Sequence, residues 1–395
     1  MNKDEQIELI IRKAVQIYNE ESLRNKLKSN KKLIVKFGAD PSRPDLHLGH
    51  TVPLRVLKIL QDMGHEINFV IGDFTAMIGD PSGKSKTRPQ LSFEETRKSG
   101  ETYFKQVTKI LDKDKTKIIY NSEWLNKMNF KDVLELTGKY TVARLLERDD
   151  FNNRFKNNIP IGVHEFMYPL MQGYDSVAIK ADIEIGGTDQ TFNLLVGREL
   201  QRDYNQEPQD VIVFPLLVGL DGKEKMSKSL DNYIGIDEEP SIMFEKAMRI
   251  PDDCLEDYFK LTTDIDSKIY SKWIKEDIFT AHKEFGKEII RMYHGKEYID
   301  SAIKKYEAKA NKSVTDEIDT IKINKTMPIL LIDLLCELKI VSSKSEAKRL
   351  IEQNGISLNQ EKVDSIDKLI TEKDLNDNWV VIQKGKKVFI KVIFE

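Results

Sequence analysis

Residues 33–74 read LIVKFGADPSRPDLHLGHTVPLRVLKILQDMGHEINFVIGDF. The apolar runs at the two ends of this stretch, residues 33–37 and 67–74, have the length and composition of buried strands. Between them, a turn rich in Gly and Pro leads into apolar residues at helical spacing, which stop near Gly64. Consecutive strand, helix and strand form one half of a doubly wound parallel sheet. The stretch therefore predicts an α/β fold.

The remainder of the chain extends this pattern. Further strands are expected near residues 178–185 and 211–218, while residues 95–175 have a mainly helical pattern, as an insertion between the two halves of the sheet. Helical periodicity continues after residue 236, a polar segment follows, and two short helices and a hairpin around residues 384–387 end the chain. The expected parts are an α/β domain over residues 1–235, an α-helical domain over 236–320, a linker over 321–327 and a small α+β domain over 328–395.

The composition limits the class of protein. A length of 395 residues with 40% hydrophobic and 32% charged residues is typical of a soluble globular protein of two or three domains. No apolar run of about 18 residues occurs, and the start is an amphipathic pattern rather than a signal peptide, so a cytoplasmic protein without a membrane partner is expected. Cys254 and Cys336 have no CxxC or Cys/His cluster nearby, which predicts neither disulfides nor a metal site. A net charge of −3 leaves only local basic patches for contact with nucleic acid.

Two histidines, His47 and His50, stand three residues apart at the start of the helix that follows the first strand. This spacing places both imidazoles on one face, beside the free backbone N–H groups and the positive end of the helix, where an anion is favoured. A phosphate is the natural ligand, and Gly49 between them allows close approach of a nucleotide base. The alternatives are a pair that only caps the helix, or a metal site, which is disfavoured because no third ligand stands nearby.

A second basic segment begins at Asp80 and reads DPSGKS. It superficially resembles a P-loop, but Gly79 and Gly83 enclose three residues where that motif has four, so we reject that interpretation. The remaining interpretations are an ordinary basic surface turn, or a loop whose Lys84 and Arg88 reach a polyphosphate while Asp80 binds an ammonium group.

The pentapeptide KMSKS, residues 225–229, follows a predicted strand and would alone indicate only a solvated basic loop. Together with HLGH at residues 47–50, it resembles the two signature sequences of class I aminoacyl-tRNA synthetases, and the resemblance covers essentially the whole chain. Residues 168–176, YPLMQGYDS, and 185–190, IGGTDQ, resemble the amino-acid-binding segments of bacterial tyrosyl-tRNA synthetases. The C-terminal module is similar to the S4-type RNA-binding domain of the KMSKS-containing subgroup of these enzymes.

This resemblance implies a Rossmann-type catalytic domain, an α-helical tRNA-binding (anticodon) domain and an S4-like RNA-binding domain. It implies a ligase that activates L-tyrosine with ATP and Mg²⁺ to tyrosyl-adenylate and pyrophosphate, without a tightly bound cofactor. The tyrosyl group would then pass to the 3′-terminal ribose of tRNA(Tyr), and the enzyme would be a homodimer. The alternatives are a tryptophanyl-tRNA synthetase, which generally lacks such a tail, and a catalytically inactive synthetase-like RNA-binding protein, which the two intact signatures disfavour.

The resemblance also implies a role for each matching residue. The ATP phosphates would be contacted by His47, His50, Lys225 and Lys228, with help from Lys84 and Arg88. The adenosine and ribose would be held by Asp40, Gly49, Gly187 and Asp189. Tyrosine would be bound by Asp80, Tyr168, Gln172, Asp175 and Gln190, with Asp175 accepting the phenol hydrogen bond. The tRNA phosphates would be contacted by Lys344, Lys348, Arg349, Lys384, Lys386 and Lys387.

The chain departs from the family pattern at Lys36. Many bacterial tyrosyl-tRNA synthetases have a tyrosine at the matching position of the first strand, where it touches the substrate phenol. The resemblance therefore assigns Asp175 but no second partner to the phenol. In the C-terminal module, basic and acidic residues are nearly balanced, so only the clustering of its lysines, and not its average charge, favours RNA over a solvated surface.

Overall fold

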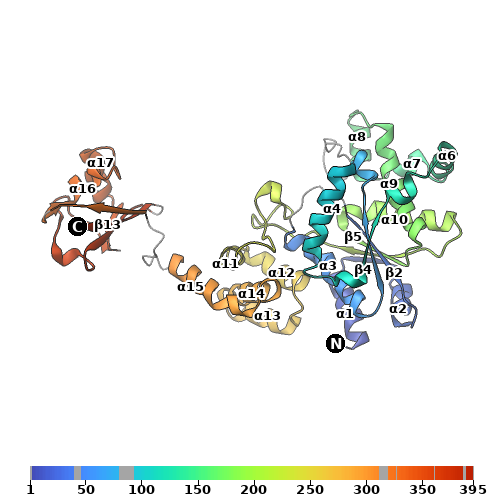
Figure 1. Cartoon of the computed structure of the whole chain (residues 1–395), viewed down its shortest axis with the longest axis horizontal. Coiled ribbons are helices and arrows are strands. Elements are labelled where there is room, and N and C mark those ends of the chain that lie inside the picture. Colours follow the sequence, from blue (N-terminus) through green and yellow to red (C-terminus); the bar gives the residue numbers. More distant parts are fainter. Residues whose placement is uncertain are drawn as a thin grey trace. The chain divides into compact units, whose positions relative to one another are not determined.

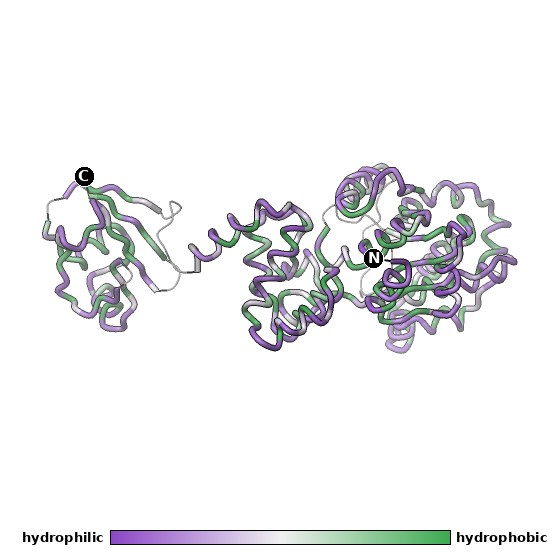
Figure 2. The backbone as a smooth tube through the Cα atoms, turned by 90° about the horizontal axis from the view of Figure 1, so that it is seen from below, coloured by the Kyte–Doolittle hydropathy of each residue, from purple (hydrophilic) through white to green (hydrophobic). Residues whose placement is uncertain are grey.

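The computed structural model describes residues 2–39, 46–79, 93–310, 319–325, 327–359, 361–385 and 388–394 (Figure 1). Contacts divide the chain into two compact units, Met1–Ala302 and Ile303–Glu395. Along the helices of both units, hydrophobic and hydrophilic residues alternate, as expected of helices with one buried face (Figure 2). None of the described helices is both long enough and apolar enough to span a membrane.

The first unit is built on a six-stranded sheet with the order β1-β6-β5-β2-β3-β4. Its strands are β1 Gln16–Tyr18, β2 Ile34–Ala39, β3 Glu66–Ile71, β4 Thr116–Tyr120, β5 Ile183–Gly187 and β6 Asp210–Phe214. All neighbours are parallel except β1, which pairs antiparallel with β6. From β2 the chain proceeds to β3 on one side and later returns to β5 on the other. The carboxyl ends of β2 and β5 therefore form a topological switch point, where ligands of such sheets bind.

Helices surround this sheet (Figure 1). They are α1 Lys3–Lys13, α2 Glu20–Lys28, α3 Leu48–Asp62, α4 Phe93–Val107, α5 Ser122–Leu125, α6 Phe130–Gly138, α7 Val142–Leu145, α8 Asp149–Lys156, α9 Val163–Ile179 and α10 Thr191–Asp203. Helix α3 joins β2 to β3 and buries Val52, Val56 and Leu60 at helical spacing. Helices α9 and α10 approach closely at Gly173, where a Cβ atom would lie 2.9 Å from Leu200 and 3.0 Å from Val196. The strand, helix and strand predicted within residues 33–74 correspond to β2, α3 and β3, so this prediction is confirmed.

Two details of this unit differ from the sequence expectations. The region expected to be mainly helical is mainly helical, but it also contains β4, an unpredicted edge strand paired with β3. Of its five residues only Thr116 is buried, so it lacks the apolar signal of a core strand. The strand expected at residues 178–185 begins later, at Ile183, because α9 runs to Ile179 and ends in a left-handed Lys180 with φ of 53°.

The remaining helices of the first unit follow β6 in the sequence, and a buried lysine connects one of them to the sheet domain. They are α11 Pro240–Ala247, α12 Leu255–Thr262, α13 Ser267–Glu276, α14 Ile278–Tyr293 and α15 Ile299–Ala310, and the last of them continues into the second unit. The fully buried Lys13 at the end of α1 donates hydrogen bonds from Nζ to the carbonyl oxygens of Thr263, Lys260 and Leu261, at 2.6, 3.0 and 3.2 Å. These contacts hold α12 to the sheet domain, and both belong to one compact unit. The domain boundary expected at residue 235, between the α/β domain and the α-helical domain, stays a prediction.

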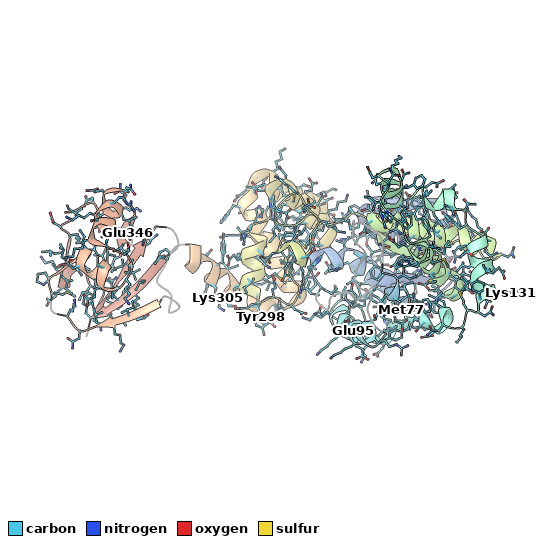
Figure 3. All side chains as sticks on the ribbon, turned by 90° about the horizontal axis from the view of Figure 1, so that it is seen from above. Met77, Glu95, Lys131, Tyr298, Lys305 and Glu346 are labelled. Atoms are coloured by element: carbon cyan, nitrogen blue, oxygen red, sulfur yellow. The ribbon has the colours of Figure 1, made fainter. Side chains whose placement is uncertain are left out.

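The second unit contains a five-stranded sheet with the order β10-β9-β12-β13-β7 and a two-stranded sheet, β11-β8. Its elements are β7 Asp319–Ile323, β8 Ile329–Leu330, α16 Leu331–Glu337, α17 Lys344–Glu352, β9 Ile356–Leu358, β10 Glu361–Lys362, β11 Leu369–Ile370, β12 Trp379–Lys384 and β13 Val388–Phe394. The two short helices and the hairpin of β12 and β13 are confirmed. Ser343 caps α17, while the carboxylate of Glu346, labelled in Figure 3, accepts from Ser342.

The linker expected at residues 321–327 is wrong in its first three residues. They form the end of β7, which pairs in parallel with β13. Ile321 and Ile323 alternate with polar residues, which is the pattern of a half-buried strand, and Ile323 packs on the core of the second unit. The polar composition of the surrounding segment hid this short alternation.

Candidate active site

The histidine pair lies at the start of α3. Residues on either side of His47 are held to a later segment, since Leu48 N donates to Ile234 O at 2.9 Å and Ile236 N donates to Leu46 O at 3.2 Å. The rings of His47 and His50 lie 3.8 Å apart between centroids, and His47 N donates to His50 Nδ1 at 3.3 Å. The pair therefore has a fixed geometry at the helix start, next to the chain that follows KMSKS.

Burial keeps both imidazoles neutral. Desolvation, with the neighbouring His50 and Lys228, lowers the pKa of His47 to about 2. Desolvation, with Lys228 and Lys225, lowers the pKa of His50 to about 4. Nδ1 of His47 is buried and has no hydrogen-bond partner among the described residues. Near neutral pH the pair thus offers neutral ring N–H groups to a ligand, and not imidazolium charges.

The two signature lysines come to the same place. Lys225 Nζ lies 3.3 Å from Asp189 Oδ2, and its side chain is 51% exposed. Lys228 Nζ lies 5.3 Å from the ring centroid of Tyr233. Both lysines are close enough to lower the pKa of His50. The structure therefore brings HLGH and KMSKS together, as the resemblance implies.

Gly49 and Gly187 allow close packing beside these lysines. A Cβ atom on Gly49 would lie 3.0 Å from the His47 ring and 3.7 Å from Cβ of Met226, the buried second residue of KMSKS. A Cβ atom on Gly187 would lie 2.8 Å from Asp189 Oδ1. Gly187 ends β5, so Asp189 and Lys225 lie at the switch point of the sheet.

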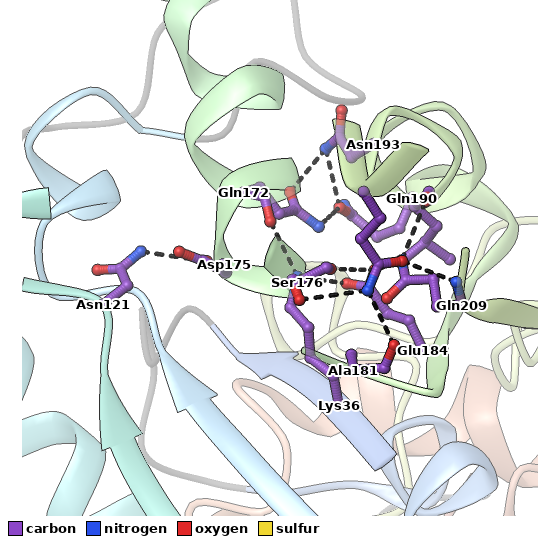
Figure 4. Close-up of polar contacts among 12 residues, drawn as sticks. Lys36, Asn121, Gln172, Asp175, Ser176, Ala181, Glu184, Gln190, Asn193 and Gln209 are labelled. Carbon is purple, nitrogen blue, oxygen red and sulfur yellow. Dashed lines mark hydrogen bonds and ion pairs between the residues drawn. The ribbon is translucent and has the colours of Figure 1, made fainter. Parts of the chain in front are cut away.

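A second group of predicted residues surrounds Asp175 on α9. The residue is 4% exposed, and its carboxylate accepts from Trp124 Nε1 at 2.8 Å. It also accepts from Asn121 Nδ2 at 3.4 Å (Figure 4). Burial raises the pKa of Asp175 to about 7, against the opposing effects of Lys36, Trp124 and Asn121. Tyr168, also 4% exposed, lies two turns earlier on the same helix. Asp175 is thus a held, buried acceptor, as a phenol site requires.

Gln172 and Gln190 meet through an amide that the sequence did not single out. Asn193 Nδ2 donates to Gln172 Oε1 at 2.9 Å and to Gln190 Oε1 at 3.1 Å, while Gln172 Nε2 lies 3.4 Å from Gln190 Oε1 (Figure 4). Arg148 in turn donates to Asn193 Oδ1 at 3.3 Å. These contacts bring α9 and the turn after β5 into one polar cluster beside Asp175.

Lys36 lies beneath this cluster and is fully buried. Its Nζ lies 2.8 Å from each of three acceptors, Gln172 O, Ser176 Oγ and Glu184 Oε1 (Figure 4). An ammonium group has three donors, so these acceptors use all of them. Lys36 therefore supports α9 and does not replace the family tyrosine as a hydrogen-bonding partner of a phenol.

Asn121, Trp124, Asn193 and Arg148 were missed by sequence reasoning. Asn121 and Trp124 follow the unpredicted strand β4, and nothing in their local sequence connects them with Asp175, more than 50 positions away. For Asn193, its place three residues after Gln190 at the start of α10 was an available signal, because an i, i+3 pair shares one helix face.

The predicted tRNA-binding residues differ in their surroundings. Lys384 Nζ donates to Glu346 Oε1 at 2.9 Å and Ile340 O at 2.8 Å, and Lys344 Nζ pairs with Asp333 at 2.7 Å. Lys348 and Arg349 are exposed on α17.

Several predicted site residues lie outside the described residues: Asp40, Asp80, Lys84, Arg88, Lys386 and Lys387. Within the described residues, no group of three or more His, Cys, Asp and Glu side chains could hold a metal ion.

Comparison with known proteins agrees with this geometry. A family model described as tRNA synthetases class I (W and Y) matches residues 28–321, and one described as the tyrosine–tRNA ligase SYY-like C-terminal domain matches residues 311–392. The chain is 50% identical to tyrosine–tRNA ligase 2 of Clostridium acetobutylicum and 47% identical to the tyrosine–tRNA ligase of Aquifex aeolicus, each match covering 100% of both chains. Its fold resembles that of a tyrosyl-tRNA synthetase from Archaeoglobus fulgidus crystallised with L-tyrosine, with a TM-score of 0.62 at 24% identity over 77% of this chain and 99% of that one. The chain belongs to the class I tRNA synthetases of the tryptophan and tyrosine group, and within that group to the tyrosine–tRNA ligases.

Proposed function

We propose that ATP binds at the carboxyl ends of β2 and β5, that tyrosine binds beside Asp175, and that tyrosyl-adenylate forms between them. The observation that carries this proposal is the meeting of the neutral His47 and His50 with Lys225 and Lys228, from segments far apart in the sequence. Class I synthetases use ATP, generally with Mg²⁺. Here Mg²⁺ would arrive with the ATP phosphates, as this ion commonly does in phosphoryl-transfer sites.

In the reaction, a carboxylate oxygen of tyrosine forms a bond to the α-phosphorus of ATP. The bond from that phosphorus to the bridging oxygen of the β-phosphate breaks, and pyrophosphate leaves with the electron pair. The enzyme needs no nucleophile of its own, because it acts by positioning and by stabilising charge on oxygen. The ring N–H groups of His47 and His50 donate to phosphate oxygens, and the ammonium groups of Lys225 and Lys228 balance charge on the departing pyrophosphate.

The polar residues around this centre hold the two substrates. Gly49, Gly187 and Asp189, with Asp40, bind the adenosine and its ribose. Tyr168 and Gln172, with Asp80, bind the tyrosine ammonium group, and Gln190 orients the carboxylate. Asp175 accepts the phenol hydrogen bond. The amide contacts of Asn193 with Gln172 and Gln190 support this assignment, because they fix both side chains before the substrate arrives.

The second step transfers the tyrosyl group to the 3′-terminal ribose of tRNA(Tyr), and we assign the second unit to tRNA binding. Exposed Lys348 and Arg349 on α17 support this assignment. A chain that ends at Ala310 loses both sheets of the second unit, strands β7 to β13, but keeps the first unit's core. Its tyrosine-dependent ATP–pyrophosphate exchange should survive, while tRNA charging should fall by on the order of tenfold or more. Both rates are measured on the same preparations.

Point variants of the full chain localise this effect. Lys348→Glu should weaken tRNA binding and flatten its salt dependence, whereas Lys373→Glu, the same charge change at another exposed lysine of the unit, serves as the control. Charging by the shortened chain at the rate of the full chain would refute the RNA-binding role of the second unit. Loss of exchange in the shortened chain would show that the second unit is needed for the first step.

A homodimer is part of the same proposal. Several large apolar side chains between α6 and the start of α9 are exposed on the surface of the first unit, where Lys131 also lies (Figure 3). They are Phe130 at 77% exposure, Leu134 at 56%, Val142 at 60%, Phe155 at 64%, Ile159 at 44% and Val163 at 80%. Six large apolar side chains exposed within residues 130–163 favour an interface with a second copy of the chain.

The substitution Val163→Asp tests this interface. Burying a valine contributes about 1.5–3 kcal/mol, and a carboxylate in its place adds a desolvation cost. The dissociation constant of the dimer should therefore rise by about tenfold or more, measured by sedimentation equilibrium. Phe279→Asp on α14, where the side chain is 51% exposed, is the matched control and should leave the dimer intact. A wild-type chain that is monomeric at micromolar concentration would contradict the proposal.

A further inference from the structure

Asn232 lies just after KMSKS, and its side chain hydrogen-bonds to the signature itself and to the turn that precedes it. Its Oδ1 accepts from Ser227 N at 2.7 Å, and its Nδ2 donates to Lys225 O at 3.2 Å. Nδ2 also donates to Asp221 Oδ2, on the turn that precedes the signature. The side chain is almost fully buried, with 4% of the residue exposed. One amide group therefore joins three points of the loop that carries Lys225 and Lys228.

Asp221 extends this contact to the start of the loop. Its Oδ1 accepts from the backbone N–H groups of Lys223 and Glu224, at 2.9 and 2.8 Å. These bonds, with that from Asn232, lower the pKa of Asp221, so its carboxylate is charged near neutral pH. The backbone also closes across the loop, because Met226 N donates to Leu217 O at 2.7 Å and Gly219 N to Glu224 O at 2.8 Å.

The Asn232 amide fits beside residue 219 because that residue is a glycine. A Cβ atom on Gly219 would lie 2.2 Å from Asn232 Nδ2 and 2.7 Å from Asn232 O. Contacts this short are not tolerated, so Gly219 and Asn232 depend on each other. The loop is thus built around the Asn232 amide, and the backbone of Lys225 is fixed where its side chain lies against Asp189.

We propose that Asn232, together with Asp221, is a positioning residue for the activation step. It touches neither substrate and acts through the backbone of Lys225 and Ser227. Without the hydrogen bonds of Asn232, the loop must become ordered when the lysines contact the phosphates. The free-energy cost of that ordering reduces the transition-state stabilisation that the lysines provide. This inference rests on the roles proposed above for Lys225 and Lys228.

A double-mutant cycle on the full chain tests the inference by single-turnover formation of tyrosyl-adenylate. Asn232→Ala should lower the rate constant by about 10- to 100-fold, with the Kd for tyrosine unchanged. In a chain that already carries Lys225→Ala and Lys228→Ala, the same substitution should have an effect of no more than about twofold, because the groups through which it acts are gone. A merely structural role would give the same loss in both backgrounds.

Two further variants make the cycle decisive. Asn359→Ala is the matched control, since Asn359 bridges backbone groups in the same way in the second unit, to Val381 N at 2.8 Å and Asp374 O at 2.5 Å, and it should leave the activation rate unchanged. Asp221→Asn keeps the shape of the side chain that accepts from Asn232 and removes its charge, so it should lower the rate constant by a smaller factor. It replaces Asn232→Ala in the test if that variant does not fold.

The outcomes separate this inference from the function on which it rests. Full activity of Asn232→Ala and Asp221→Asn beside impaired lysine variants would overturn the positioning role alone. An equal loss from Asn232→Ala in both backgrounds would also overturn it. Full activity of the lysine variants would overturn both the lysine roles and the positioning role.

Discussion

Replacing Lys225 with alanine should slow tyrosyl-adenylate formation by about 10²- to 10³-fold, the effect of removing one preorganised charge-stabilising group from an acyl- or phosphoryl-transfer site. Lys228→Ala should act in the same direction. Both ammonium groups lie near the histidine pair, and both can follow the charge that moves to the departing pyrophosphate. An interaction made mainly in the transition state lowers the rate constant more than it lowers ATP affinity. Single-turnover kinetics with varied ATP separate the two quantities.

A neighbouring lysine supplies the control for this prediction. Lys223 is exposed on the same loop, and its contact in the loop is made by its backbone N–H, which alanine retains. Lys223→Ala should therefore leave both the rate constant and the ATP affinity close to those of the wild type. Weaker ATP binding with an unchanged rate constant in the Lys225 and Lys228 variants would show that these lysines bind the ground state and not the transition state.

The second large effect is expected at Asp175. Asp175→Ala should lower kcat/KM for tyrosine in ATP–pyrophosphate exchange by on the order of 10²-fold or more, because it removes the phenol acceptor and also takes away the carboxylate that accepts from Trp124 Nε1. Any residual use of phenylalanine should fall much less, because phenylalanine has no hydroxyl to pair. The ratio of the two kcat/KM values is the quantity to measure.

Glu165 on the same helix provides a matched comparison. It is also 4% exposed, and its carboxylate pairs with Arg154 at 2.5 Å. Glu165→Gln should reduce the use of both amino acids by the same factor, because its contacts are structural. An equal loss for both amino acids in Asp175→Ala would assign Asp175 to the same structural class.

Local patterns predicted the centre of the fold but not its edges. Strand β2, helix α3 and strand β3 have apolar residues at a period that the chain displays without any long-range contact. Strands β4 and β7 were missed because both are short and mostly half-buried or exposed, so neither has the apolar run of a core strand. Such edge strands are stabilised by pairing with a neighbour that is distant in sequence, and that pairing leaves little trace in composition.

Some residues of the candidate site could likewise be predicted from local sequence, and others could not. His47, His50, Lys225 and Lys228 were recognisable because both signatures stand in short contiguous segments. Trp124 was not, because its contact with Asp175 depends on how β4 and α9 pack together.

Lys36 and Asn232 show two further reasons why local sequence patterns do not reveal the whole site. The sequence marked Lys36 as a departure from the family pattern, yet its partner Glu184 is 148 positions away and only the fold reveals the pair. Asn232 stands close to the signature in sequence, but an asparagine there has no distinguishing local pattern.

The most direct test of the account is ATP–pyrophosphate exchange by the full chain, measured with tyrosine, tryptophan and phenylalanine in turn. A site that combines the phosphate-binding pairs His47/His50 and Lys225/Lys228 with the buried acceptor Asp175 should exchange with tyrosine and at most marginally with the other two. Faster exchange with tryptophan would contradict the amino-acid assignment. No exchange with any of the three would contradict the proposal that this site forms an aminoacyl-adenylate.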